Sequence, residues 1–130
     1  PTSEGKQLRD FCFIGDFVQS IFCSIDNTKA FGEVINIASG EPISIKDVVI
    51  KIQNIVAAGK PQFGKVAYRS GENMELYADI TKANKLLNWK SILSFKETAE
   101  FTASWYLNYF NKKIDLKIFT LNQISTYFKK

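Results

Sequence analysis

The alternation of apolar and polar residues along the chain predicts short strands that alternate with amphipathic helices. Compact apolar runs bounded by turn residues are typical of buried strands, and apolar residues at helical spacing are typical of helices that pack on one face. We therefore expect three strands and four helices, separated by turns rich in Gly, Pro, Ser and Asn. The expected strands span residues 9–14, 34–37 and 63–68, and the expected helices span residues 16–25, 44–58, 79–87 and 94–110.

Small polar or acidic residues mark the expected helix starts. Asp16 and Asp79 stand where an N-cap accepts hydrogen bonds from the first free backbone N–H groups. Ser44 and Ser94 are each followed three residues later by an acidic residue, which resembles a capping box. Apolar and aromatic residues on the inner sides of the last two helices are expected to form core, among them Trp89, Phe95, Trp105, Tyr106 and Tyr109.

Two successive βα units favour parallel pairing, because each crossover is helical and right-handed. The prediction is an α/β fold with a small parallel-type sheet of about three short strands and about four helices. A length of 130 residues fits one domain. Within it we place a lobe at residues 1–111 and a basic C-terminal tail at residues 112–130. In this tail, residues 114–118 alternate as in a strand while residues 121–128 fit a helix, so its structure stays open.

The net charge of +4 is not spread over the chain. Residues 1–111 carry 12 basic and 12 acidic side chains, so the whole excess lies in the tail, where five lysines face Asp115 alone. The basic balance is therefore a property of the tail and not of a broad binding face, and nucleic acid is an unlikely partner.

Cysteine and histidine usage narrows the possible chemistry. Cys12 and Cys23 lie eleven residues apart in apolar surroundings, which favours buried thiols in a reducing cytoplasm; a disulfide is the alternative. The sequence has no histidine, which removes a histidine general base and most metal sites. No apolar run approaches the roughly 20 residues that cross a bilayer, so no membrane partner is expected. Because the chain begins at Pro1, we expect it to be an excerpt.

Several short motifs follow one another in a distinctive order. A Gly-rich loop leads into an Arg-Asp-aromatic strand and an Asp-started helix, and later come Asn-x-x-Ser-Gly, Arg-x-Gly-Glu, Asp-x-x-Lys-Ala, Leu-x-Trp and Trp-Tyr. This order resembles the C-terminal half of the extended short-chain dehydrogenase/reductase family, the NAD-dependent epimerases, dehydratases and reductases of nucleotide sugars. Residues 63–74 look closest to its sugar 4-ketoreductases. The motifs occupy residues 5–16, 36–40, 69–72, 79–83, 87–89 and 105–106.

The resemblance implies three substrate-binding residues. Arg9 and Arg69 would hold the diphosphate of a nucleotide sugar from two sides, and Glu72 would accept a hydrogen bond from a ribose hydroxyl. A guanidinium suits a diphosphate because it stays charged and can donate two parallel hydrogen bonds. The alternatives are ordinary surface ion pairs, of Arg9 with Asp10 and of Glu72 with Arg69.

The resemblance also implies that the chemistry lies elsewhere. The seven glycines form no dinucleotide-binding cluster, so NAD or NADP would bind outside this chain, to a Rossmann domain that it lacks. Tyr109 and Lys113 have the family's Tyr-x-x-x-Lys spacing but lie at a helix end far from any cofactor motif, so no catalytic residue and no metal is expected here.

The function that follows is that of a nucleotide-sugar-binding lobe of an NAD(P)-dependent epimerase, dehydratase or 4-ketoreductase. We expect this lobe to be inactive without the Rossmann half, and to form a homodimer or oligomer. The alternative is a non-enzymatic α/β interaction module that uses the basic tail on RNA or on an acidic partner.

Overall fold

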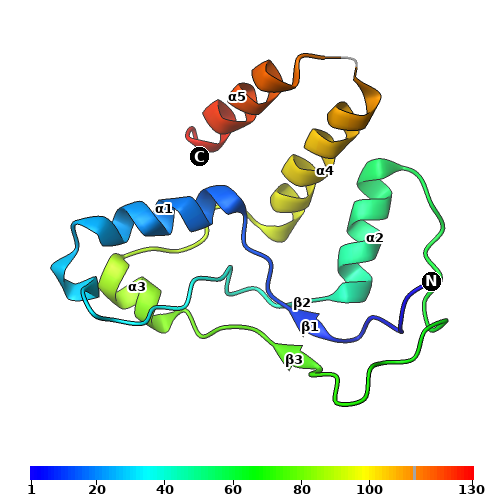
Figure 1. Cartoon of the computed structure of the whole chain (residues 1–130), viewed down its shortest axis with the longest axis horizontal. Helices are drawn as coiled ribbons and strands as arrows, with labels where there is room; N and C mark the ends of the chain where they lie inside the picture. The colour runs from blue at the N-terminus through cyan, green and yellow to red at the C-terminus, as the bar shows by residue number, and fades with distance from the viewer. Residues whose placement is uncertain (113) are drawn as a thin grey trace.

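A computed structural model describes residues 1–112 and 114–130, and it confirms the α/β prediction (Figure 1). Three two-residue strands form one small sheet at one edge of the molecule (Figure 1), and the described residues form five α-helices, one more than predicted. The elements are β1 (Leu8–Arg9), α1 (Ile14–Ile25), the 3-10 turn η1 (Thr28–Ala30), β2 (Ile43–Ser44), α2 (Ile45–Val56), β3 (Glu75–Leu76), α3 (Thr81–Leu87), α4 (Phe95–Asn111) and α5 (Leu116–Tyr127).

The sheet is mixed, with β1 between β2 and β3. Leu8 pairs with Glu75 in parallel, the orientation predicted for the sheet, whereas its pairing with Ser44 is antiparallel. The antiparallel pair forms because the chain after Gly40 turns back into β2 and then enters α2 directly. Gly5 allows the loop before β1 to reach the start of α2. Its φ is 73°, and a Cβ there would lie 2.8 Å from the backbone nitrogen of Lys46.

The predicted positions of two strands are wrong, and the first strand is much shorter than the predicted residues 9–14: β1 ends at Arg9, and Ile14 already belongs to α1. Residues 34–37 form no strand, and Val34 is 83% exposed. Residues 63–68 form turns and loop, and the sheet uses Glu75–Leu76 instead. Apolar content predicts burial, but a strand also needs a neighbouring backbone to pair with. The local sequence pattern does not specify that neighbour.

The four predicted helices are present, with two starts corrected. Helix α1 begins two residues before Asp16, and its N-cap position is Phe13, which has no side-chain cap. Helix α3 has Ile80 and not Asp79 at its N-cap position, although Asp79 accepts from the backbone N–H of Thr81. The other two starts agree with the prediction: Ser44 accepts from the backbone N–H of Asp47, and Ser94 forms a complete capping box with Glu97.

The tail forms a helix, α5, that packs back on α4 as an antiparallel hairpin (Figure 1). Asp115 caps α5 by accepting from the backbone N–H groups of Lys117 and Ile118. Side-chain hydrogen bonds join the two helices: Trp105 Nε1 donates to Thr120 Oγ1 over 2.9 Å, and Gln123 donates to a carbonyl of α4 over 2.8 Å.

The centre of the small core is formed by Ala83, Leu87 and Trp89. Trp89 is therefore core, as predicted. Tyr106 and Tyr109 were predicted to be core and are half exposed, because α5 covers another side of α4. No helix in the described part of the chain has the length and apolar character that crossing a membrane requires.

Candidate functional site

Arg9 lies on the central strand, where both neighbouring strands fix its backbone. It pairs with Ile43 of β2 on one side and Leu76 of β3 on the other. Its guanidinium donates to the Leu8 carbonyl over 2.7 Å and to the carboxylate of Glu72 over 2.7 Å. The two side chains of this ion pair are only about a fifth exposed, at 23% and 21%, so the pair is better ordered than a surface salt bridge.

Glu72 is presented by a tight turn that also contains Arg69. The backbone N–H of Glu72 donates to the Arg69 carbonyl over 3.0 Å, and Gly71 between them has a φ of 75°. A left-handed φ favours glycine, so the Gly of the Arg-x-Gly-Glu motif is required by the turn itself. Arg69 is exposed. The fold therefore brings the Arg9 strand and the Arg69–Glu72 turn together, although about sixty residues separate them in sequence.

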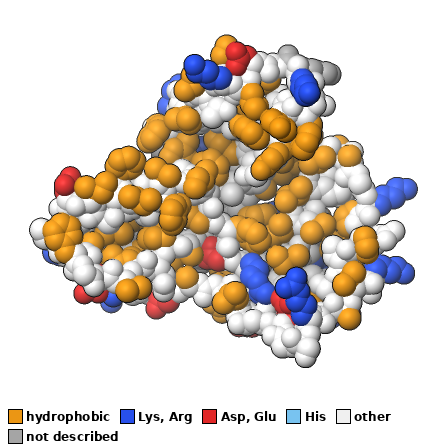
Figure 2. Space-filling model, in the orientation of Figure 1, with side chains coloured by type: hydrophobic (Ala, Val, Ile, Leu, Met, Phe, Trp, Pro, Cys, Tyr) orange, Lys and Arg blue, Asp and Glu red, His pale blue; other side chains and the backbone are white. Residues whose placement is uncertain are grey.

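Neither alternative ion pair occurs among these groups. Glu72 pairs with Arg9 and not with Arg69. Asp10 instead accepts from the backbone N–H groups of Ser39 and Gly40 and from the Ser39 hydroxyl, at 2.6–3.0 Å. Asp10 thus fastens the loop after residues 34–37 to the end of β1. In Figure 2, basic side chains lie around an acidic one over β1 and β3.

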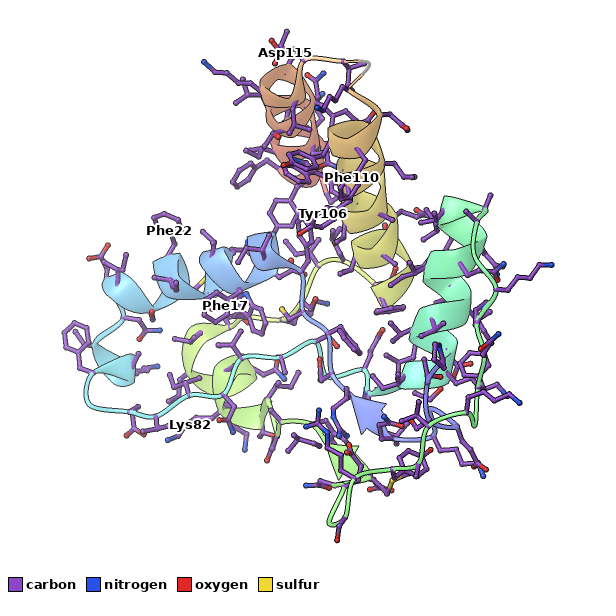
Figure 3. The ribbon with its side chains drawn as sticks, turned by 45° about the vertical axis from the view of Figure 1, so that its right-hand side comes forward. Phe17, Phe22, Lys82, Tyr106, Phe110 and Asp115 are labelled. Carbon is purple, nitrogen blue, oxygen red and sulfur yellow. The ribbon has the colours of Figure 1, made fainter. Side chains whose placement is uncertain are left out.

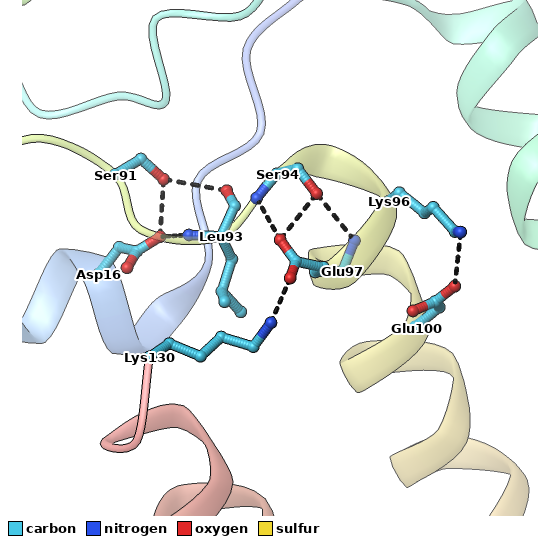
Figure 4. Close-up of polar contacts among 8 residues, drawn as sticks. All are labelled: Asp16, Ser91, Leu93, Ser94, Lys96, Glu97, Glu100 and Lys130. Carbon is cyan, nitrogen blue, oxygen red and sulfur yellow. Dashed lines mark hydrogen bonds and ion pairs between the residues drawn. The ribbon is translucent and has the colours of Figure 1, made fainter.

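A second polar cluster, around Asp16, was missed by the sequence reasoning. Asp16 is fully buried, and its carboxylate accepts from Ser91 Oγ over 2.6 Å, Leu93 N over 3.2 Å and Tyr127 Oη over 2.8 Å (Figure 4). Its backbone carbonyl accepts from Trp89 Nε1. Burial, followed by the hydrogen bond to Asp16, raises the pKa of Tyr127 above its usual value. An Asp just before an apolar run was the available signal, but it also fits an N-cap.

Two hollows lie outside the Arg9 region. An apolar groove of about 830 Å³ runs between α1 and the α4–α5 hairpin. Figure 3 shows Phe22 on the side of α1 that faces this groove, and Tyr106 on the hairpin. A smaller polar hollow of about 450 Å³ lies beside α3. Neither hollow is lined by Arg9, Arg69 or Glu72, so neither is the shared pocket expected for a diphosphate.

Acidic side chains lie at the helix starts. A pyrophosphate binds at a free helix N-terminus with a positive dipole end. In the described residues each α-helix start faces an acidic side chain of the chain itself, supplied by Asp16, Asp47, Asp79, Glu97 and Asp115. These carboxylates disfavour a phosphate at the helix starts.

The remaining predictions concern metal binding, the cysteines and the Tyr109–Lys113 pair. No group of His, Cys, Asp and Glu residues suited to a metal occurs within residues 1–112 and 114–130. Cys12 and Cys23 are free and half-buried, and burial, with Asp16 and Asp10 nearby, raises the pKa of Cys12 to about 11. Lys113 lies outside the described residues, so its spacing from Tyr109 cannot be related to a site.

Comparison with known proteins decides the family. A sequence model of the family described as GDP-mannose 4,6 dehydratase matches residues 2–102. The chain belongs to this family of NAD-dependent nucleotide-sugar epimerases and dehydratases. The UDP-glucuronate 4-epimerase of Thermodesulfobacterium geofontis is 32% identical over 104 residues, which are 78% of this chain and 31% of that protein. The CDP-abequose synthase of Salmonella typhimurium is 29% identical over 101 residues, 74% of this chain and 33% of the relative.

Solved structures agree with the sequence relatives. The UDP-glucuronic acid 4-epimerase from Bacillus cereus in complex with NAD matches with a TM-score of 0.73 and 26% identity, over 88% of this chain and 35% of that one. The same enzyme in complex with UDP-glucuronic acid and NAD matches with a TM-score of 0.66 and 31% identity, over 76% and 32%. This family member thus spans about a third of the length of the relatives it matches.

Proposed function

We propose that this chain is the nucleotide-sugar-binding lobe of an NAD(P)-dependent epimerase, dehydratase or 4-ketoreductase acting on NDP-sugars, and that it is inactive without an NAD-binding part. The observation that carries the proposal is the meeting of Arg9 with the Arg69–Glu72 turn within the family-matched residues 2–102. Relatives that match this chain include an epimerase that was solved with UDP-glucuronic acid and NAD.

The charges explain how such a lobe would recognise a diphosphate. Arg9 is held by two strands and already donates from both terminal nitrogens, to the Leu8 carbonyl and to Glu72. A diphosphate oxygen would replace the Glu72 carboxylate as the hydrogen-bond acceptor of the Arg9 guanidinium. Arg69 would then approach the diphosphate from the turn. Glu72, once released, would be free to accept from a ribose hydroxyl. Remote binding of this kind supplies orientation for chemistry that occurs at the sugar.

The partner in this proposal is the NAD-binding part, and the apolar side of α1 is the surface it would cover. Four helically spaced side chains of α1 are exposed to an unusual degree, with Phe22 at 69%. These four residues are Ile14, Val18, Phe22 and Ile25. They would be buried if the other two thirds of a family enzyme packed against this side of α1. When bound, NAD or NADP supplies hydride transfer at the sugar carbon, and this lobe holds the nucleotide end.

The site assignment is tested by kinetics of the lobe joined to an NAD-binding part. Arg9→Ala and Arg69→Ala should each raise KM for an NDP-sugar about ten- to hundredfold, the usual cost of one charge-assisted contact. Lys60→Ala, an exposed cation at the end of α2, is the matched control and should leave KM unchanged. Titration of each variant with UDP-, CDP- and dTDP-sugars would identify the base. Unchanged kinetics in both arginine variants would remove the assignment.

A further inference from the structure

The connection between α4 and α5 carries exposed apolar side chains and two exposed lysines at the same place. All of these residues lie within two helical turns of the connection, at the end of the hairpin far from the sheet (Figure 1). Phe110 is 73% exposed and Ile118 is 59% exposed. We call this set the hairpin tip: Tyr109, Phe110, Lys112, Ile114, Lys117, Ile118 and Leu121.

The exposed apolar residues of α5 are not its packing face. Helix α5 packs on the rest of the chain through Thr120, Gln123 and Tyr127, which bond to α4 and to Asp16. Ile118 and Leu121 point elsewhere and stay exposed. Since ordinary surface positions favour polar residues, an aliphatic outer side next to exposed aromatic residues indicates a second apolar environment.

Lysines outnumber acids at the hairpin tip. Lys112 and Lys117 are exposed on either side of the connection. Asp115 is the only acid of residues 112–130, and its carboxylate is engaged as the N-cap of α5. The nearest acids of α4 face lysines: Glu100 pairs with Lys96, and Glu97 pairs with Lys130. Two exposed lysines against the one acid Asp115 leave the tip with a small net positive charge around an apolar centre.

We propose that the hairpin tip binds the surface of a bilayer that contains anionic phospholipid. Aliphatic and aromatic side chains enter the boundary between headgroups and acyl chains, while lysines next to them contact anionic headgroups through their flexible stems. Each lysine near such a surface strengthens binding about fivefold. The tip lies on the membrane and does not cross it. This inference goes beyond the nucleotide-sugar function and revises the expectation of no membrane partner.

Other occupants fit the tip less well. A second copy would bring lysines against lysines, and single-stranded RNA would leave the aliphatic residues Ile114, Ile118 and Leu121 without a stacking partner. The family model ends at residue 102, before the tip. An anionic bilayer satisfies the apolar and the basic side chains together.

Co-sedimentation of the full chain with lipid vesicles tests the inference. We expect binding to vesicles of phosphatidylcholine mixed with phosphatidylglycerol, little binding to phosphatidylcholine alone, and release at about 1 M salt, where screening is short-ranged. The charge variant Lys112→Gln with Lys117→Gln should weaken partitioning about 25-fold. The apolar variant Ile118→Ser with Leu121→Ser should weaken it about tenfold or more.

Matched controls keep the result interpretable. Val34→Ser removes an even more exposed apolar residue away from the hairpin, and Lys60→Gln with Lys65→Gln removes two exposed charges elsewhere. Both should bind vesicles as the unmodified chain does, and circular dichroism confirms helix content in every variant. The inference is overturned by absent vesicle binding, by equal loss in the control variants, or by tip-dependent binding to an RNA oligonucleotide or a second copy without vesicle binding.

Discussion

At the scale of residues, the buried carboxylate of Asp16 holds three segments together. It joins the start of α1 to the loop after α3 through Ser91 and Leu93, and to α5 through Tyr127. We expect Asp16→Ala to lower the free energy of unfolding by about 3 kcal/mol, because it leaves buried donors without an acceptor. Urea denaturation followed by circular dichroism measures this.

The control is Asp26→Ala, at the exposed far end of the same helix. It removes a carboxylate from a helix C-terminus, where negative charge is unfavourable, and should leave stability unchanged or slightly raised. Equal midpoints for the two variants would show that the Asp16 hydrogen bonds do not stabilise the fold.

The candidate site shows what single residues reveal before a structure is known. Arg9, Arg69 and Glu72 were found through the motif order, and the ion pair of Arg9 with Glu72 was not foreseen, because no local pattern fixes which carboxylate reaches a guanidinium across the fold. Asp16 was interpreted as an N-cap since it precedes an apolar run. In the structure the Asp16 carboxylate accepts tertiary hydrogen bonds instead, and only the folded chain brings the Tyr127 hydroxyl to it.

At the scale of elements, helices were predictable and strands were not. Helices α2 and α4 carry their own signals, an apolar stripe and a capping Ser, so their bounds agree with the prediction. The strands are two residues long and are defined by their partners, which local patterns do not specify. Helix α5 was ambiguous because its apolar residues lie both on the side that packs and on the side that is exposed.

One contact ties α4 to the residues after α5 and can be measured by titration. The ammonium of Lys130, with added hydrogen bonds from Ser94, lowers the pKa of Glu97 to about 2 (Figure 4). Because this pKa lies below the ordinary value of 4.5, the contact stabilises the fold above about pH 4.5, and that stabilisation is lost as pH falls toward 2. Lys130→Gln should raise the pKa of Glu97 toward 4.5, as carbon NMR of the glutamate carboxyl groups would show.

The matched control for this titration is Lys96→Gln. Lys96 lies on the same helix and pairs with Glu100 at 3.9 Å, so its loss should leave the pKa of Glu97 in place. If Glu97 still titrates near 2 in Lys130→Gln, the capping box alone sets its pKa. The ion pair of Lys130 with Glu97 then does not hold the end of α5 against α4.

At the scale of the whole molecule, the chain exposes more apolar surface than a self-sufficient domain would. Among the described residues, nine apolar side chains are buried while twenty-two large apolar ones are exposed. The exposed ones are concentrated on α1 and on the hairpin (Figure 2). A surface of this kind is typical of an interaction surface, and the chain spans about a third of the length of its relatives.

Without an NAD-binding part, that surface should drive self-association of the chain. We expect a dimer or larger oligomer in sedimentation velocity, held by the apolar side of α1. Ile14→Asp with Phe22→Asp places two charges in this contact and should shift the chain to a monomer, since buried unpaired charges are costly. The tip variant Ile118→Ser with Leu121→Ser should leave the oligomer intact, because it alters a different surface. A monomer for the unmodified chain would contradict the prediction, and an oligomer dispersed only by the tip variant would place the self-association on the hairpin instead of α1.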